Sequence, residues 1–413
     1  MKSAHLIALG MTALLSASAL ADTGDILDGI NMFTPEEGDP AYKVAANEKY
    51  GTQWGVDVAY AYWGTHRAEG GTPGHDQNYA LLHAQLNQRL IKDDTNGGTW
   101  VRVEVSGTWG LDKRTAREEY DMVGGCNAAC EPHVDIFGPH NGGLPELALM
   151  QYMGHKRYCL VAGMVNLTNY FDAVSIANDT FSGFCNSAFT NSKVLPLTSC
   201  NTAFGAVFQA ELTDKDYVQL AAAQTGGDFA AGTDPFSWSK RDGFAVVGEY
   251  GHIFGDDAGV IRINPFYRHF RAMQFDDGRC HDSAGIVGSI DWNVNDSVTV
   301  FTRAGFAAKQ QYSPAAELTA GLNLKLIPSR EDDFLGLAAG VVKGQTPYGM
   351  EDELTGDPLG GQNHRREYVL EATYNFQVND YMRIMPHVEY ISRPAYSTLS
   401  DETVFGVQTV FSF

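Results

Sequence analysis

Residues 52–62 read Thr-Gln-Trp-Gly-Val-Asp-Val-Ala-Tyr-Ala-Tyr, a regular alternation of two kinds of side chain. In an extended strand, neighbouring side chains point to opposite faces. Trp54, Val56 and Tyr60 therefore share one face with other large apolar residues, whereas Asp57 shares the opposite face with small alanines. This period of two predicts a β-strand with one apolar face and one small or polar face.

The same alternation recurs along the chain as far as its last residue. It repeats in segments of about ten residues, about sixteen in all, and many of them end in Tyr, Trp or Phe. A soluble β-sandwich also alternates, but aromatic residues at the strand ends are typical of the girdles that mark two membrane interfaces. Further examples are residues 80–90, 101–105, 204–212, 318–326, 368–376 and 403–413.

These segments predict an all-β fold, a transmembrane antiparallel β-barrel of about sixteen strands. A strand in hydrocarbon must pair each backbone N–H and C=O, and only a closed barrel leaves no unpaired edge. Residues 93–99 form a short connection, whereas residues 112–144 form a long one rich in Gly, Pro and charge. We therefore expect short periplasmic turns and long outer loops, and we expect the 112–144 loop to fold into the barrel.

The first 50 residues differ from the rest of the chain. Lys2, an apolar run over residues 5–15 and the small-x-small pattern Ala19-Leu20-Ala21 predict a signal peptide over residues 1–21. Residues 22–50 precede the first alternating segment and are interpreted as a periplasmic or plug segment, and residues 51–413 as the barrel. The chain contains no uninterrupted apolar stretch of about 20 residues, which argues against a transmembrane helix.

Composition and cysteine content limit the location and the partners. The net charge of −21 argues against nucleic-acid binding, which requires a positive surface. The six cysteines would meet an oxidising periplasm after export, where disulfides persist. We predict the loop disulfides Cys126–Cys130 and Cys185–Cys200, although sequence alone leaves the other pairings open.

Several ordered motifs carry a resemblance to a known family. Residues 163–172 read Gly-Met-Val-Asn-Leu-Thr-Asn-Tyr-Phe-Asp, and Asn-Asp-Thr-Phe follows at 178–181. With later stretches, this pattern resembles the carbohydrate-selective porin family of the OprB type over residues 160–413. The resemblance implies a sixteen-stranded barrel of the bacterial outer membrane, a monomer or weak homo-oligomer, that passes monosaccharides and other small hydrophilic solutes. The later stretches are Ser289–Trp292, Phe301–Gly305, Gly321–Asp333, Arg366–Glu371, Met385–Ile391 and Arg393–Pro394.

The charged residues on the polar face of the strands are the candidate pore-lining and solute-binding residues. A narrow point that passes sugars needs hydrogen-bonding groups that bind weakly enough to release the solute. Alternatively, such charges only solvate a water-filled lumen and pair across it, because the interior of a large barrel is generally polar. The candidates are Arg89, Arg102, Glu104, Arg262, Arg268, Arg303, Lys325 and Glu371.

Two further groups of residues have two interpretations each. Trp54, Trp63, Trp100 and Trp109 would stack sugar rings or, as we favour, belong to the interface belts. The Asn- and Asp-rich segment 166–179 would bind solute or, as we favour, shape a loop by bonding to its own backbone.

Other classes of function find less support in the sequence. No motif indicates a cofactor, a metal site, a nucleotide site or an activated nucleophile, so we expect no enzyme. The alternatives to a sugar pore are a general, non-specific porin and a structural or adhesive barrel that does not transport. Expected partners are outer-membrane lipid, lipopolysaccharide and the barrel-assembly machinery. The last is expected because the terminal Phe413 resembles the aromatic signature that this machinery recognises.

Overall fold

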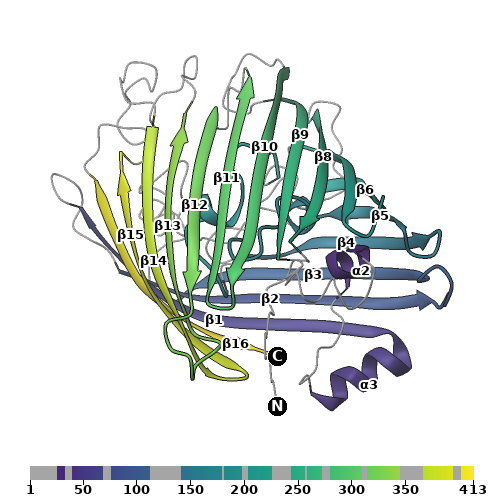
Figure 1. Ribbon diagram of the computed structural model, residues 1–413, viewed down its shortest axis with the longest axis horizontal. Coiled ribbons are helices and arrows are strands. Elements are labelled where there is room, and N and C mark those ends of the chain that lie inside the picture. Colours follow the sequence, from purple (N-terminus) through teal and green to yellow (C-terminus); the bar gives the residue numbers. More distant parts are fainter. Residues whose placement is uncertain are drawn as a thin grey trace.

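A computed structural model shows a closed antiparallel barrel of sixteen strands, which confirms the predicted fold class (Figure 1). Each strand pairs with its neighbours in sequence, and β1 closes the barrel against β16. The structure describes residues 26–32, 40–67, 76–111, 141–178, 181–197, 203–225, 243–255, 258–271, 280–308, 314–344, 366–393 and 401–413. None of the helices in these ranges is long and apolar enough to cross a membrane.

The strands run from Thr52 to Ser412. They are β1 (Thr52–Arg67), β2 (Asp76–Ile91), β3 (Thr99–Gly110), β4 (Asn141–Met153), β5 (Tyr158–Val165), β6 (Ala203–Glu211), β7 (Asp216–Gln224), β8 (Gly243–Phe254), β9 (Gly259–Arg271), β10 (Cys280–Asn295), β11 (Val298–Ala308), β12 (Ala316–Leu324), β13 (Phe334–Lys343), β14 (Arg366–Asn379), β15 (Met382–Ser392) and β16 (Glu402–Ser412).

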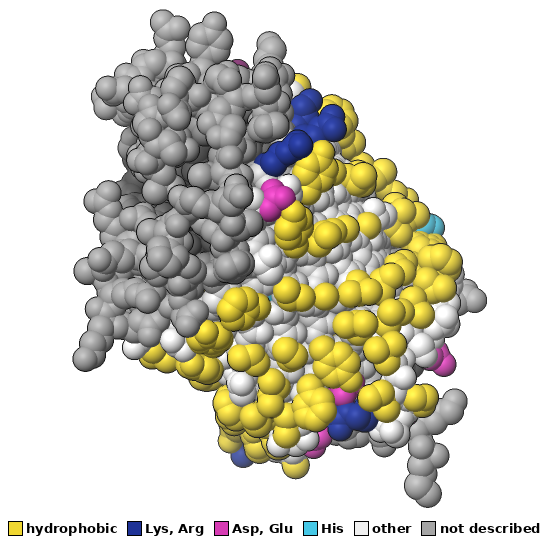
Figure 2. All heavy atoms as spheres, turned by 90° about the vertical axis from the view of Figure 1, so that its left-hand side faces the viewer, with side chains coloured by type: hydrophobic (Ala, Val, Ile, Leu, Met, Phe, Trp, Pro, Cys, Tyr) yellow, Lys and Arg dark blue, Asp and Glu magenta, His cyan; other side chains and the backbone are white. Residues whose placement is uncertain are grey.

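The alternation in the sequence separates an apolar exterior from a polar interior. On β3, Val105 is exposed, whereas the inward-facing Arg102 and Glu104 are buried. The same arrangement holds around the barrel, and Figure 2 shows bands of apolar side chains across the outer surface. An exterior of this kind suits hydrocarbon as its solvent, because the backbone polar groups are paired within the sheet.

Two of the four tryptophans assigned to the interface belts lie elsewhere. Trp54 and Trp109 are on the outward face, and Trp109 is exposed. Trp63 and Trp100 are buried on the inward face, where Trp63 packs against Tyr79. The belt prediction is wrong for these two residues because it relied on residue type alone. Their positions along the strands place both on the inward face.

The two ends of the barrel differ in their connections. Turns at one end are short, as between β10 and β11, where Asp296 and Ser297 join the strands, and β1 begins and β16 finishes at this end. We call it the turn end and the opposite rim the loop end. The long connection 112–140 belongs to the loop end and lies outside the described residues, so its predicted inward folding stays a prediction.

Two helices in the described residues precede the barrel. Helix α3 (Ala41–Tyr50) is followed by Gly51, whose φ of 64° ends the helix, and β1 begins at the next residue. The shorter helix α2 (Ile26–Asn31) is buried against the inner wall, where the Asn31 Nδ2 donates to Gln209 Oε1 of β6 at 2.7 Å. The Lys156 ammonium of the β4–β5 turn also pairs with Asp28 of α2.

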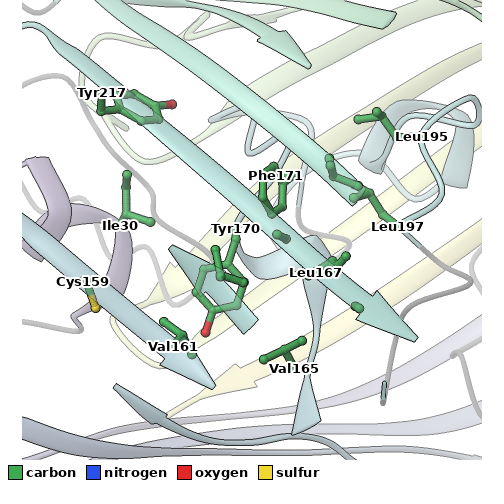
Figure 3. Close-up of a cluster of buried hydrophobic side chains, with 14 of the residues drawn as sticks. Ile30, Cys159, Val161, Val165, Leu167, Tyr170, Phe171, Leu195, Leu197 and Tyr217 are labelled. Carbon is green, nitrogen blue, oxygen red and sulfur yellow. The ribbon is translucent and has the colours of Figure 1, made fainter. Parts of the chain in front are cut away.

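The described part of the connection between β5 and β6 lies inside the barrel. We call its described residues 166–178 and 181–197 the inner segment; it contains the short helices η1 (Leu167–Asn169) and α5 (Ser187–Thr190). Its apolar side chains join three buried clusters with inward-facing residues of the wall. Figure 3 shows one cluster, in which Leu167, Tyr170 and Phe171 lie near Val161 and Val165 of β5.

Candidate functional site: the inner segment and its carboxylate anchors

The inner segment is anchored first to the wall that β3 and β4 form. Asn169 Nδ2 donates to Glu104 Oε2 at 2.5 Å and to Glu146 Oε2 at 2.7 Å, so one amide joins two carboxylates. The Tyr170 hydroxyl donates to Glu146, and Arg102 Nη1 donates to the oxygen of this hydroxyl at 3.3 Å.

A second anchor is the ion pair between Asp172 and Arg303 of β11. Arg303 Nε lies 2.8 Å from Asp172 Oδ2, and both side chains are fully buried. Asp172 also accepts from the Ser192 backbone N–H at 2.7 Å, and Arg303 Nη1 donates to the Phe189 carbonyl at 3.2 Å. The pair therefore joins the start of the inner segment to its later part and to the wall.

The middle of the inner segment is held by Glu371 of β14. Its carboxylate accepts from the backbone N–H groups of Cys185 at 2.7 Å and Asn186 at 2.9 Å. The Asn186 side chain donates to Glu389 Oε2 of β15 at 2.6 Å and accepts from Ala188 N–H at 3.0 Å. One Asn thus bonds to the wall and caps α5.

Three more carboxylates of the wall bind the segment. Glu317 of β12 accepts from the Ser192 hydroxyl and from the Lys193 N–H at 2.7 Å. Asp291 of β10 accepts from Ser175 N–H at 3.3 Å and pairs with Arg262 of β9. Glu249 of β8 accepts from the Asp172 N–H at 3.0 Å, as well as from neighbouring wall side chains.

These contacts fix the inner segment across the barrel. A buried carboxylate is costly unless it is paired or hydrogen-bonded. Each of these wall carboxylates except Glu389 receives at least two donors, several of them from backbone N–H groups that would otherwise be buried and unpaired. The inward acidic residues thus define where the segment lies and so shape the remaining opening.

The structure places the eight predicted pore residues in three settings. Arg102, Glu104, Arg303 and Glu371 contact the inner segment directly, and Arg262 reaches it through Asp291. Arg268 is buried near the loop end of β9. The two remaining candidates are near the turn end: the Arg89 guanidinium lies 5.6 Å from the Trp100 ring centroid, and Lys325 is exposed in the β12–β13 turn.

Several anchoring residues were missing from the prediction although they follow the same strand parity. Glu146 alternates with the exposed Leu147 and Leu149 of β4, and this alternation was visible in the sequence. The residues of the segment itself carried no periodic signal. The missed residues are Glu146, Asp172, Asn186, Glu249, Asp291, Glu317 and Glu389.

The predicted disulfides involve residues that are mostly outside the described ranges. Cys126, Cys130 and Cys200 lie outside them. Cys185 is buried in the inner segment, where its Sγ lies 3.6 Å from His387 Nδ1 and 3.9 Å from Gln408 Oε1. Both pairings stay predictions.

The fold and the segment that narrows its interior define a porin of the bacterial outer membrane. Residues 279–413 match the family model described as carbohydrate-selective porin, OprB family, which confirms the recognition made from the sequence over this third of the chain. No curated protein matches the chain in sequence.

Solved porin structures share the fold. OprB of Pseudomonas putida superimposes with a TM-score of 0.71 at 14% identity, covering 90% of this chain and 96% of that protein. The outer-membrane channel DcaP of Acinetobacter baumannii gives a TM-score of 0.55 at 10% identity over 88% and 97% of the two chains. OmpF of Salmonella typhi, solved in complex with daunomycin, gives 0.53 at 10% identity over 88% and 98%. At these identities the similarity shows the fold alone.

Proposed function

We propose that this porin mediates passive diffusion of small uncharged hydrophilic solutes, above all sugars of monosaccharide size. One observation supports this proposal most directly: the half-exposed residues of the inner segment are mainly hydroxyl and amide side chains. Because the wall surrounds the segment, its exposed parts face the remaining space inside the barrel. The half-exposed residues are Thr168, Ser175, Ile176, Asn178, Ser182, Ser187, Asn191 and Lys193.

The chemistry of this surface suits a sugar. Hydroxyl and amide groups both donate and accept hydrogen bonds, as sugar hydroxyls do, and such bonds exchanged with water have a small net free energy. Binding of this strength permits release, which transport requires. Glu104 and Glu371 already accept from the segment, so they act mainly as positioning residues in this proposal.

Ion conductance in a planar bilayer tests the proposal. We expect glucose to block the current of the refolded protein in a concentration-dependent way, and longer maltooligosaccharides to enter less readily. Replacing the half-exposed Asn191 by Ala should weaken the glucose block severalfold, because an amide is removed from the segment. The matched variant Asn379→Ala, exposed at the turn between β14 and β15, should leave the block unchanged.

The alternative functions give different results in the same experiment. A steady current that sugars do not affect would indicate a general porin and would refute sugar preference. A barrel with a structural role is favoured by the amount of apolar side chain that fills the interior, including Ile26, Leu27 and Ile30 of α2. Absence of any conductance from correctly folded protein would support that second candidate.

We also propose roles for the N-terminal residues. Residues 1–21 would be removed as a signal peptide, and α2 would act as a plug-like element that narrows the turn end. The burial of α2 and its bond from Asn31 to Gln209 support the second role. A variant that lacks residues 22–32 should conduct more current than the full mature chain, and equal conductance would contradict the role.

A further inference from the structure

Two basic residues face each other on the outer surface at the loop end of the barrel. Lys343 is the last residue of β13 and Arg366 the first residue of β14, and they are direct partners in the antiparallel register. Both are exposed, and both share the outward parity of exposed apolar neighbours such as Leu337 and Leu370. Figure 2 shows basic side chains gathered above the apolar bands on this side of the barrel.

A third cation lies beside this pair. Arg393 follows β15, and its guanidinium is 5.7 Å from the ring centroid of Tyr368, an exposed aromatic residue on the outward face of β14. Ser392, the residue before it, pairs with Tyr368 across the two strands. Three positive groups at the loop ends of β13, β14 and β15 therefore occupy one part of the rim, where Asp401 also accepts from the Arg393 N–H at 3.3 Å.

The charge of Lys343 and Arg366 is not balanced within the described part of the protein. Like charges directly opposite each other on a sheet destabilise the pairing. Elsewhere, basic residues in two turns do have acidic partners: the exposed Lys92 lies 3.1 Å from Asp94, and the half-buried Arg330 lies 2.5 Å from Asp333. In the described residues no carboxylate lies within 4.0 Å of Lys343 or Arg366. In a chain with a net charge of −21, this arrangement indicates an anionic ligand.

We propose that Lys343, Arg366 and Arg393 bind the phosphate groups of a glycolipid in the outer leaflet. Arginine binds phosphate oxygens through two parallel N–H donors, and lysine adds a compact positive charge. The patch faces the lipid and adjoins exposed apolar residues, including Tyr368, Leu370 and Val388. A ligand with phosphates and acyl chains can contact both the basic residues and the apolar residues of this surface. Free inorganic phosphate can contact only the basic residues.

Binding of lipid A to the full mature protein in detergent, measured by native mass spectrometry, tests the site. We expect the double variant Lys343→Gln/Arg366→Gln to bind lipid A with two phosphates about tenfold more weakly than the unmodified protein. Monophosphoryl lipid A should bind more weakly to the unmodified protein and should lose less affinity in the variant. The charge-preserving variant Lys343→Arg/Arg366→Lys should retain most of the affinity and shows that the barrel remains folded.

A matched control removes the same charges at the opposite end. Lys92 and Arg157 are exposed in turns at the turn end, and Lys92→Gln/Arg157→Gln should bind lipid A as the unmodified protein does. Equal losses in the two double variants would mean that overall charge governs binding, and this would overturn the site. Competition by millimolar inorganic phosphate at the same residues would also overturn the proposed lipid ligand.

Discussion

Replacing Glu371 by Ala should release the middle of the inner segment without opening the barrel wall. The carboxylate accepts two buried backbone N–H groups, those of Cys185 and Asn186. Each buried donor left without a partner costs about 1–3 kcal/mol, so the docked position should lose about 2–6 kcal/mol. Because strand pairing does not involve this side chain, the barrel should persist while residues 181–191 open more often.

Hydrogen–deuterium exchange followed by mass spectrometry measures this opening. Peptides that cover residues 181–191 should exchange at least about 30-fold faster in Glu371→Ala, since about 2 kcal/mol corresponds to this factor. Peptides from β1 and β2 should not change. The control Glu331→Ala removes an exposed carboxylate from the β12–β13 turn and should leave all these rates unchanged. Unaltered exchange over 181–191 in Glu371→Ala would refute the assignment of Glu371 as an anchor.

Three further predictions follow from other contacts. Breaking the buried ion pair with Arg303→Met should destabilise docking of the inner segment by about 3–5 kcal/mol, because Asp172 keeps an uncompensated charge; thermal unfolding and exchange over residues 187–193 measure this loss. In the β12–β13 turn, burial opposes ionisation of Asp333, but hydrogen bonds from Arg330 and from the Gln377 N–H outweigh it and lower the pKa of Asp333. Ionised Asp333 should therefore stabilise the protein fully above its unfolded pKa, about 3.9, and this contribution should disappear as the pH falls through the lower folded pKa. In urea titrations, the difference in unfolding free energy between the unmodified protein and Asp333→Asn should be constant from pH 7 to 5 and should shrink below about pH 4. Asn31→Ala removes the bond to Gln209 that holds α2, and single-channel recordings should then show more frequent transitions to a higher conductance, whereas Asn47→Ala on α3 should not alter the current.

The strands could be predicted from the sequence because strand parity is a local property. In residues 52–62, for example, the face of each side chain depends only on its position along the strand, and the structure has Val58 and Tyr60 exposed and Asp57 buried. Hydrocarbon outside and polar groups inside make this alternation consistent from one strand to the next. The same reasoning identified Arg102, Glu104 and Glu371 as inward-facing residues.

The position of the inner segment could not be predicted in this way. Cys185 and Glu371, whose carboxylate accepts from the Cys185 N–H, are 186 residues apart in the chain. Only the closed barrel brings these two residues together. The segment has no periodic pattern, and its best local signal was Asn166, whose side chain accepts from the Thr168 N–H as a loop-shaping residue does. For Asn166 itself this bond agrees with the loop-shaping interpretation of residues 166–179, but it gave no direction for the segment as a whole.

The anchors of the inner segment also impose an order on assembly. Its first residues bond to β3 and β4, which precede it in the chain, while Cys185 and Asn186 bond to β14 and β15, which follow it. The later bonds have no acceptors until the C-terminal strands are in place. The inner segment can therefore take its final position only when strands from both halves of the chain are in place, and a barrel without β14 would leave the N–H groups of Cys185 and Asn186 without their acceptor.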